Sequence, residues 1–328
     1  MKNIAIFTIS GDIHAGVIAD EITALGANCY VVESDKLISH GGLSANITKG
    51  TYTINDRHGR AFDIGKLDVV WWRRAVRAQT IESDDFPDVQ REVINNDCEA
   101  TLLGMLFAAF TGVWISHPMD TRMAANKVWQ GKLAEECGLL HPKTLVSQNP
   151  DEVYEFIREL EGRIIIKPVH GTIKLPLYTQ LLDMNNLPTR DDIAVCPTIY
   201  QELIPGKLHF RINIFGNKVY AFKLESDDLD WRPDLTIPFE LAELPHDLVW
   251  RLKRMIDGMG LRMGIVDMKY HEVNGGIYFL EVNPQGQFLF LQAITGFDLA
   301  KEFAHFLVNY SDEQHETSLS SESIGRFN

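Results

Sequence analysis

The chain has few cysteines and no long hydrophobic run. Its four cysteines lie far apart in 328 residues and form neither a CxxC pair nor a Cys/His metal spacing. We therefore expect reduced thiols rather than a disulfide framework. The apolar stretch near the N-terminus, residues 4–7, is too short for a signal peptide, and no later run approaches the roughly 18 residues of a membrane span. These absences predict a cytoplasmic protein without a membrane partner.

Positive charge is also scarce. The chain has 31 Lys and Arg against 45 Asp and Glu, which gives a formal net charge of -14. This balance opposes general binding to a phosphate backbone, and no run of Lys or Arg forms a nucleic-acid patch. We therefore expect no nucleic-acid partner. An acidic chain can still bind a nucleotide, but only where cations are concentrated in one cleft.

Several common catalytic motifs are missing. There is no GxxxxGK[ST] loop, and Gly258-Met259-Gly260 does not stand between a strand and a helix, so it fails as a dinucleotide fingerprint. Neither GxSxG nor HExxH occurs. These absences argue against P-loop and Rossmann proteins and the commonest hydrolases, and leave a ligase that activates its substrate with phosphate.

The composition is that of an ordinary globular protein, with 45% hydrophobic and 23% charged residues. Its length fits two or three lobes of an α/β protein with α+β character. The first lobe opens as a β-α-β unit and closes near His117-Pro118. Its expected elements are strands at 3–9, 29–32 and 67–72 and helices at 15–25 and 89–110.

Two further lobes are expected after residue 117. The second has short elements: helices at 126–137 and 151–160 and strands at 143–146 and 163–167. The third is predicted to be an antiparallel sheet with strands near 198–204, 208–215, 218–225, 262–271 and 276–283 and helices near 246–259 and 297–309. The polar, Ser/Glu-rich residues 311–328 lack the apolar side chains needed for a fold, so we expect disorder there.

The clearest chemical pattern is acidic. Glu281 and Asn283 are two residues apart on one expected strand, so they share a face, and Asp267 lies on the strand before the Asn274-Gly275-Gly276 turn. Oxygen ligands on adjacent strands suit Mg²⁺, which keeps water and substrate phosphates in its other positions. The alternative is a solvated hairpin face. The apolar neighbours of Glu281 disfavour it, because unpaired acids on a buried strand are costly.

Two lysines could provide the cations that a nucleotide needs. Lys167 ends an apolar strand, and Lys127 begins a helix after Asn126. A lysine at either place can bind phosphate, although each could also be an ordinary solvated charge. The presence of both before the acidic hairpin favours a phosphate clamp.

A third pattern runs from Gln201 to Gly206. This strand breaks at Pro205-Gly206 and could leave backbone groups at Glu202, Leu203 and Ile204 free for an adenine edge. An edge strand is the alternative. The next strand carries Arg211 among apolar residues, where an arginine needs an anionic partner, either a substrate group or a structural acid.

The order of these motifs, over roughly residues 115–310, resembles the ATP-grasp superfamily. Two further motifs, Trp71-Trp72-Arg73-Arg74 and Asp230-Trp231-Arg232, make the chain most similar to the graspetide (microviridin-type) peptide ligases and more distantly to the ribosomal-protein glutamate ligases. The resemblance implies an ATP-grasp fold with an open α/β pre-ATP-grasp domain. The implied domains are 1–117, a central lobe at 118–197 and a C-terminal lobe at 198–310.

The resemblance also implies a reaction. ATP would phosphorylate a carboxylate, and an amine or hydroxyl would attack the acyl phosphate, which forms amide or ester crosslinks in a ribosomally made precursor peptide with leader and core. The implied cofactors are ATP and Mg²⁺. The implied roles are ATP binding by Lys127, Lys167, Gln201, Glu202, Leu203 and Ile204, metal binding by Asp267, Glu281 and Asn283, catalysis by Arg211 and Arg232, and peptide binding by Trp72, Arg73 and Arg74.

Some points stay open. Trp71 to Arg74 could instead be core tryptophans followed by surface arginines. Lys207 and His209 stand where many ATP-grasp sequences have an acid for the ribose, so the ribose contact is unassigned. The competing function is a ligase that adds an amino acid to a small molecule or a protein terminus. A catalytically silent nucleotide-binding protein or scaffold is disfavoured, because both lysines and all three metal ligands are present. Ester or amide product and homodimer formation are undecided.

Overall fold

The structure is a computed structural model that describes residues 1–37, 42–75, 86–170, 177–234 and 236–310. Its contacts separate the chain into two compact units. Unit 1 contains Met1–Pro118, Phe215–Asn217 and Gln287–Asn328, and unit 2 contains Met119–Ile214 and Lys218–Gly286. The domain boundaries expected from the sequence stay a prediction, and the tail 311–328 lies outside the described residues.

Unit 1 is built on a parallel sheet of four strands in the order β2-β1-β6-β7. A smaller antiparallel sheet has the order β3-β4-β5. The elements are β1 (Asn3–Thr8), α1 (Ile13–Ala24), β2 (Asn28–Glu33), η1 (Ser34–Lys36), β3 (Ser44–Asn46), β4 (Thr51–Asn55), β5 (Ala61–Asp63), η2 (Ile64–Lys66), β6 (Val69–Trp72), α3 (Asp88–Ala109), β7 (Val113–Ile115), α9 (Leu289–Thr295) and α10 (Leu299–Asn309).

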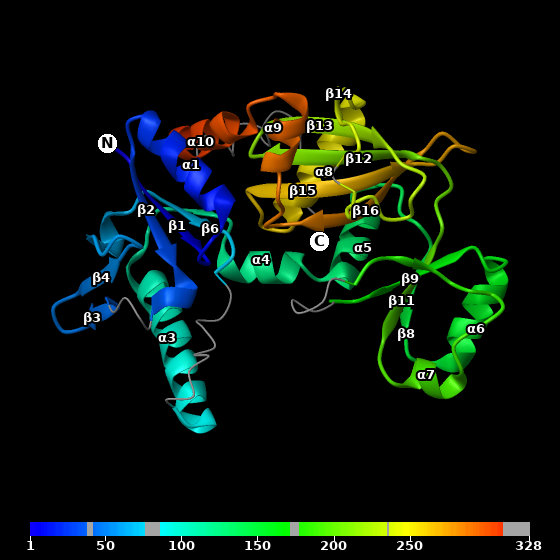
Figure 1. The fold of residues 1–328 in the computed structure, drawn as a ribbon, viewed down its shortest axis with the longest axis horizontal. Coiled ribbons are helices and arrows are strands. Elements are labelled where there is room, and N and C mark those ends of the chain that lie inside the picture. The colour runs from blue at the N-terminus through cyan, green and yellow to red at the C-terminus, as the bar shows by residue number, and fades with distance from the viewer. Residues whose placement is uncertain (38–41, 76–85, 171–176, 235, 311–328) are drawn as a thin grey trace, which may run out of the picture. The chain divides into compact units, whose positions relative to one another are not determined.

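The parallel sheet has the apolar strands that this arrangement requires. Residues 4–7 of β1 are fully buried, as expected for a parallel strand covered on both faces. The α10 helix runs beside α1 (Figure 1), and its Phe303 ring lies 4.7 Å from the ring of Trp71 on β6. A helix from the last part of the described chain therefore completes the core of a sheet made from the first part.

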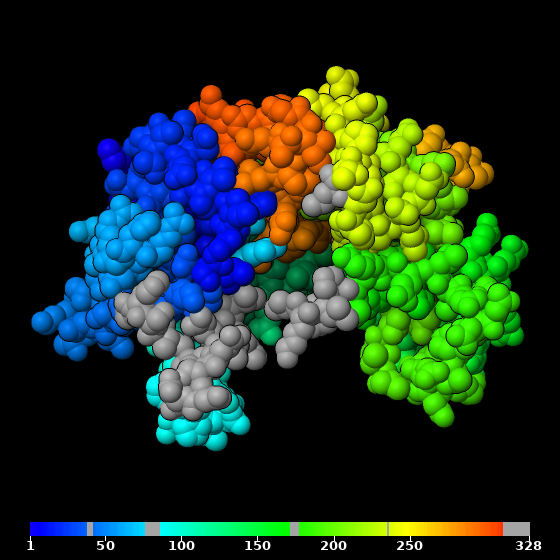
Figure 2. Space-filling model, in the orientation of Figure 1, coloured from blue at the N-terminus to red at the C-terminus, as the bar shows by residue number. Residues whose placement is uncertain are grey.

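The α3 helix is only partly packed. Its buried side chains are Leu102, Met105 and Leu106, all in its C-terminal half. The first turns are largely exposed, and Figure 2 shows their cyan atoms extending beyond the body of unit 1. The C-terminal half of α3 thus attaches it to the sheet.

Unit 2 contains two sheets. The smaller has the order β10-β9-β11-β8 and the larger β14-β13-β12-β15-β16. The elements are α4 (Pro118–Ala124), α5 (Lys127–Glu136), β8 (Thr144–Ser147), α6 (Pro150–Glu159), β9 (Ile164–Pro168), β10 (Gln180–Leu181), α7 (Arg190–Ala194), β11 (Thr198–Glu202), β12 (Leu208–Phe215), β13 (Lys218–Glu225), β14 (Glu240–Ala242), α8 (His246–Gly258), β15 (Met263–Tyr270) and β16 (Ile277–Asn283).

The placement of β11 corrects the sequence analysis. The strand expected near 198–204 belongs to the smaller sheet, where Tyr200 lies opposite Leu145 of β8 and Ile166 of β9. Tyr200 packs in a core cluster with Val153 and Ile157 of α6. The local pattern predicts a strand correctly but cannot name its partner, because strand pairing is decided by distant residues.

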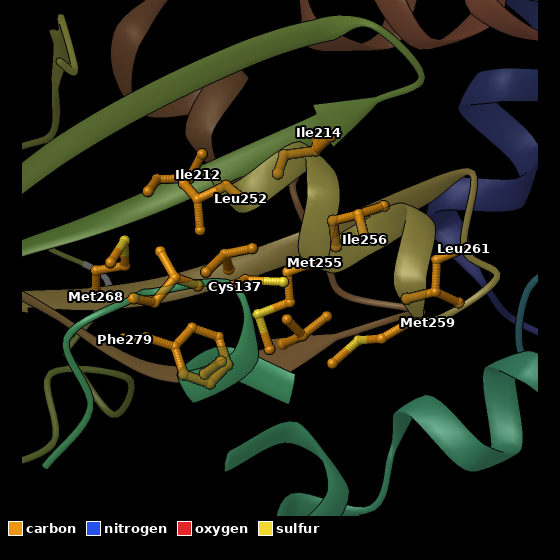
Figure 3. Close-up of a cluster of buried hydrophobic side chains, with 14 of the residues drawn as sticks. Cys137, Ile212, Ile214, Leu252, Met255, Ile256, Met259, Leu261, Met268 and Phe279 are labelled. Atoms are coloured by element: carbon orange, nitrogen blue, oxygen red, sulfur yellow. The ribbon is translucent and has the colours of Figure 1, made fainter. Parts of the chain in front are cut away.

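The larger sheet has one apolar face and one polar face. Figure 3 shows Ile212 and Ile214 of β12 packed with Leu252, Met255 and Ile256 of α8. Because side chains alternate along a strand, the odd-numbered residues of β12 point to the opposite face. His209, Arg211 and Asn213 are therefore presented together on the face away from α8.

No helix in the described ranges combines the length and the hydropathy needed to cross a membrane.

Candidate active site

Unit 2 contains a cavity of about 510 Å³. It lies within the usual size range of small-molecule sites. Its wall includes many of the residues that the sequence singled out: Lys127, Lys167, Gln201, Glu202, Leu203, Ile204, Arg232, Asp267, Glu281 and Asn283. The structure therefore brings the predicted phosphate, base and metal ligands into one cavity.

The acidic wall comes from two paired strands. Asp267 on β15 lies directly opposite Glu281 on β16, so the two carboxylates share one face of the sheet. Asn283 lies two residues further along β16, and its Oδ1 accepts a hydrogen bond from the Gln285 N–H at 3.1 Å. Three oxygen donors thus converge on the cavity from adjacent strands.

Glu281 is surrounded by cations. Its Oε2 lies 3.3 Å from the Nζ of Lys127, and its Oε1 lies 3.6 Å from Nη1 of Arg232. Burial acts to raise the pKa of Glu281, but Lys127, Lys167 and Arg232 outweigh it and lower the pKa. Glu281 is therefore a carboxylate anion in this setting.

Lys167 stands in the cavity without a direct ion-pair partner among the described residues. Burial lowers its pKa to about 8; the charge of Glu281 opposes this effect and that of Lys127 adds to it. An ammonium held in such a place is stabilised when an anion enters.

Arg211 pairs with one of the acids. Its Nη1 donates to both carboxylate oxygens of Asp267, at 2.8 and 2.7 Å. Burial raises the pKa of Asp267, Arg211 opposes this effect, and Glu281 adds to it, so the pKa stays raised. Arg211 therefore fixes Asp267, which corresponds to the structural pairing that the sequence left open.

Arg232 is held by its own motif. Its Nε donates to Oδ1 of Asp230 at 2.7 Å, and this bond raises the pKa of Arg232. Trp231, between them in the chain, is buried against Phe239 with the rings 5.3 Å apart. The Asp-Trp-Arg motif thus anchors a permanent cation beside Glu281.

The backbone near Ile204 departs from the expectation. The N–H of Glu202 donates to the Lys143 carbonyl at 2.8 Å, and that of Leu203 to the Arg163 carbonyl at 3.0 Å, so neither donor is free. Gln201 offers a side-chain group instead. Its Nε2 donates to Thr144 Oγ1 at 2.8 Å, whereas its buried Oε1 has no partner in the described part of the chain.

The Trp-Trp-Arg-Arg motif belongs to unit 1. Trp71 and Trp72 are buried core residues, as one alternative had it, but Arg73 is also fully buried and not a surface residue. Its Nε donates to Oδ2 of Asp12 at 2.6 Å, and its guanidinium lies 5.1 Å from the Trp71 ring centroid. Arg74 is half-buried. The buried Nη1 and Nη2 of Arg73 have no partner among the described residues.

Sequence reasoning missed two residues around Arg73. Asp12 accepts from Thr8 Oγ1 at 2.6 Å in addition to Arg73. His14 accepts at Nε2 from the N–H groups of Phe288 and Leu289, at 2.9 and 3.0 Å, and burial with nearby Arg73 lowers its pKa to about 4. Asp12 and His14 follow a predicted strand in a Gly-containing turn, which was the one local signal of a functional position.

The acidic wall fits Mg²⁺ by its chemistry. The described residues contain no cluster of three or more His, Cys, Asp or Glu side chains suited to a metal. The candidate set has two carboxylates and one amide, all oxygen donors, and a hard cation that also binds substrate phosphates needs no more from the protein. Both acids lie next to cations, Glu281 next to Lys127 and Asp267 next to Arg211.

No family model and no curated protein matches the chain. Solved structures do. The macrocyclase MdnC from Microcystis aeruginosa MRC, bound with precursor peptide MdnA, is 26% identical, with a TM-score of 0.83 over 94% of this chain and 100% of that one. A Chryseobacterium gregarium RiPP-associated ATP-grasp ligase, in complex with ADP and a leader and core peptide, is 24% identical, with a TM-score of 0.85 over 94% and 97%.

A RimK domain protein from Sphaerobacter thermophilus is more distant, with 14% identity and a TM-score of 0.57 over 94% of this chain and 100% of that one. These matches confirm the predicted mixed α/β ATP-grasp fold. They also confirm the resemblance to graspetide ligases and, more distantly, to RimK-like ligases.

Proposed function

We propose that this chain, which has the ATP-grasp fold, is an ATP-dependent ligase that joins side chains of a precursor peptide through amide or ester bonds. The observation that carries the proposal is the cavity in which Lys127 and Lys167 face Asp267 and Glu281. The likeness to MdnC, at 26% identity over nearly the whole of both chains, supports a peptide as the substrate.

ATP would bind in the cavity with its phosphates toward the two lysines. The Lys167 ammonium has no direct ion pair in the described chain, and Lys127 shares Glu281 with Arg232. The free Oε1 of Gln201 would accept a hydrogen bond from the base, with Glu202, Leu203 and Ile204 beside it. These contacts favour one orientation of the nucleotide, with the base near β11 and the phosphates near β16.

Asp267, Glu281 and Asn283 would hold Mg²⁺. The ion would neutralise phosphate charge and orient the terminal phosphate for transfer. The role of Arg211 would be to keep Asp267 ionised and in place, since it bonds both carboxylate oxygens. Once Glu281 binds Mg²⁺, Lys127 and Arg232 would become available to the phosphate groups.

The reaction would proceed in two balanced steps. A substrate carboxylate oxygen attacks the terminal phosphorus of ATP, and ADP leaves with the electron pair of the broken P–O bond. An amine or hydroxyl of the same peptide then attacks the acyl carbon, the C–O bond to phosphate breaks, and phosphate leaves with that electron pair and takes up the proton of the nucleophile. Arg232, fixed by Asp230, would stabilise the negative charge on the acyl phosphate and on the oxyanion that follows.

Acidic side chains of the peptide would be recognised in unit 1 by Arg73 and Arg74. Arg73 follows β6 and Asp12 follows β1, and these neighbouring parallel strands continue to opposite sides of the sheet. Ligands of open α/β sheets bind at such a point. The two unpaired Nη groups of Arg73 are suited to a carboxylate, which arginine often binds through two hydrogen bonds. Trp72 would support them from the core.

Mass spectrometry tests the proposal. The purified chain is incubated with ATP, Mg²⁺ and the peptide encoded beside its gene, which includes leader and core. Each bond formed removes one water, so the product should lose about 18 Da per crosslink. A gain in mass by a free amino acid, without any such loss, would favour the competing amino-acid ligase.

Binding without turnover under any of these conditions would instead favour the silent nucleotide-binding protein. A cytoplasmic location, the absence of a nucleic-acid partner and homodimer formation stay predictions.

A further inference from the structure

We infer that His209 and Lys269 form the ribose subsite of the nucleotide cavity and recognise the sugar hydroxyls without a carboxylate. This inference rests on the proposed function, because it requires a nucleotide in the cavity. It assigns a role to two residues of the cavity wall that the proposed reaction leaves unused.

Both side chains are buried, polar and insufficiently paired. His209 on β12 is 3% exposed, lines the cavity, and has no hydrogen-bond partner for Nε2 in the described part of the chain. Lys269 on β15 is 7% exposed, lines the same cavity, and makes no direct ion pair with the described residues. Buried polar groups are normally satisfied, so two such groups in one cavity wall point to a polar ligand.

Contacts between their two strands indicate that they lie opposite each other. β12 and β15 are neighbours in the larger sheet, and Arg211 bonds to Asp267 across them. The strands run antiparallel, because the Pro205 carbonyl before β12 accepts from the N–H of Glu272 after β15. His209 comes two residues before Arg211 and Lys269 two residues after Asp267, so the two side chains meet on the same face. The electrostatic effect of Lys269 on His209 agrees with this register.

Along the strands, His209 and Lys269 lie between the Pro205-Gly206 segment and Asp267, where the sugar of a bound nucleotide would lie. Next to them lies the segment at Pro205-Gly206, where the Pro205 carbonyl accepts from the Glu272 N–H at 3.2 Å. Gly206 has φ +125, and a Cβ there would come 2.6 Å from the Tyr270 carbonyl oxygen, so only glycine permits this approach. On the other side follows Asp267 of the metal set. Two residues of strand span about 6.7 Å, which is the space for a ribose between base and phosphates.

The charges of the pair suit a diol. Burial, with the charge of Lys269, lowers the pKa of His209 to about 4, although Asp230 opposes this effect. The imidazole is therefore neutral near pH 7. Its Nε2 can form one hydrogen bond with a hydroxyl, as acceptor or as donor according to the tautomer. The Lys269 ammonium donates to the oxygen of the neighbouring hydroxyl. A ribose offers two adjacent hydroxyls, each able to donate and accept.

Lys207, the other residue that the sequence left open, does not compete for this role. Its side chain is 61% exposed and lies 2.5 Å from Oδ1 of Asp227. It is absent from the cavity wall.

Calorimetry with nucleotide analogues tests the inference. ATP, 2′-deoxyATP and 3′-deoxyATP are titrated into the wild-type protein with Mg²⁺. We expect ATP to bind about tenfold more tightly than at least one deoxy analogue, since losing one hydrogen bond to a buried group costs about 1.4 kcal/mol. In His209→Ala and Lys269→Met this preference should fall to below about threefold, while deoxy analogues keep their affinity.

The matched control is Lys132→Met, an exposed lysine on α5 paired with Glu136, which should keep the preference. His209→Gln, which retains a hydrogen-bonding group, should restore part of it. Equal affinity of the wild type for ATP and both deoxy analogues would overturn the inference even if a variant fails to fold. A preference unchanged in both variants overturns it too. Failure of the wild type to bind any of the nucleotides would instead refute the proposed function.

Discussion

The Nζ of Lys127 on α5 lies 3.3 Å from Oε2 of Glu281 on β16. A second contact fixes this geometry: the Gln130 side chain donates to the Val282 carbonyl at 2.8 Å and accepts from the Val282 N–H at 2.9 Å. The helix that carries the lysine is therefore bonded to the strand that carries the acid. The fold therefore fixes the spacing of the two backbones that carry the proposed phosphate ligand and the proposed metal ligand.

Replacing Glu281 by Gln should abolish turnover and leave the fold intact. The change keeps the shape of the side chain but removes the charge that would hold Mg²⁺ and that balances Lys127 and Arg232. Release of ADP, measured with peptide at several Mg²⁺ concentrations, should fall at least about a hundredfold, or about 2.7 kcal/mol. Asn283→Ala should act in the same direction. Wild-type rates in both variants would contradict the metal assignment.

Lys167→Met should weaken ATP binding without loss of stability. The lysine is held in a cavity where burial lowers its pKa, and a hydrogen bond to a charged group contributes about 1.5–3 kcal/mol, so affinity should drop about tenfold to a hundredfold. Calorimetry with ATP measures the change. The exposed Lys132→Met is again the control, and an equal effect of both changes would exclude a specific role for Lys167.

The two arginines of the Trp-Trp-Arg-Arg motif should behave differently. Arg73→Ala leaves Asp12 buried without its cation, which should lower the free energy of unfolding by about 3–5 kcal/mol. Arg74 is half-buried, so Arg74→Ala should cost less than about 1 kcal/mol. Urea unfolding separates the two. Peptide crosslinking by the stable Arg74→Ala protein should fall more than ATP binding does, and unimpaired crosslinking would remove Arg74 from the peptide site.

Stability should fall in weak acid because of His14. Its ordinary pKa of 6.5 is lowered to about 4 in the fold, where the neutral ring accepts two backbone N–H groups. The unfolded chain therefore binds the proton more tightly. The contribution is complete above pH 6.5 and is lost as the pH falls toward 4, and it amounts to about 3 kcal/mol.

His209 has a lowered pKa in the same window, so the comparison must be with a His14→Gln protein. Urea unfolding between pH 8 and pH 4.5 should show a shallower loss of stability in this variant than in the wild type. Parallel curves would show that His14 titrates normally.

Local patterns predict much of the candidate site. Alternation along one strand places Glu281 and Asn283 on a common face, and the same rule applied to residue 269 would have found Lys269 beside Asp267. The residue type is read directly from the sequence and the face follows from alternation along the strand, so local information suffices for these cases.

What could not be predicted depends on distant parts of the chain. Nothing near Thr198–Glu202 indicates that β8 and β9 are its partners. Arg73 is buried because Asp12, which caps α1 after another strand, supplies its anion. His14 depends in the same way on the backbone of Phe288. Such pairings follow from the fold as a whole, so a sequence pattern shows that an arginine needs an anion but not which one.

The discontinuity of unit 1 has a consequence for synthesis on the ribosome. The sheet of β1, β2, β6 and β7 emerges early, but Phe303 of α10, which contacts Trp71, is translated last among the described helices. At 5–20 residues per second, roughly 10–40 s separate the synthesis of β7, the last strand of this sheet, from that of Phe303. All of unit 2, which ends at Gly286, is translated in that interval. The sheet is therefore made before the helix that completes its core. During this interval Trp71 lacks its contact with Phe303, so any chaperone that shields β6 would be needed until α10 has been made.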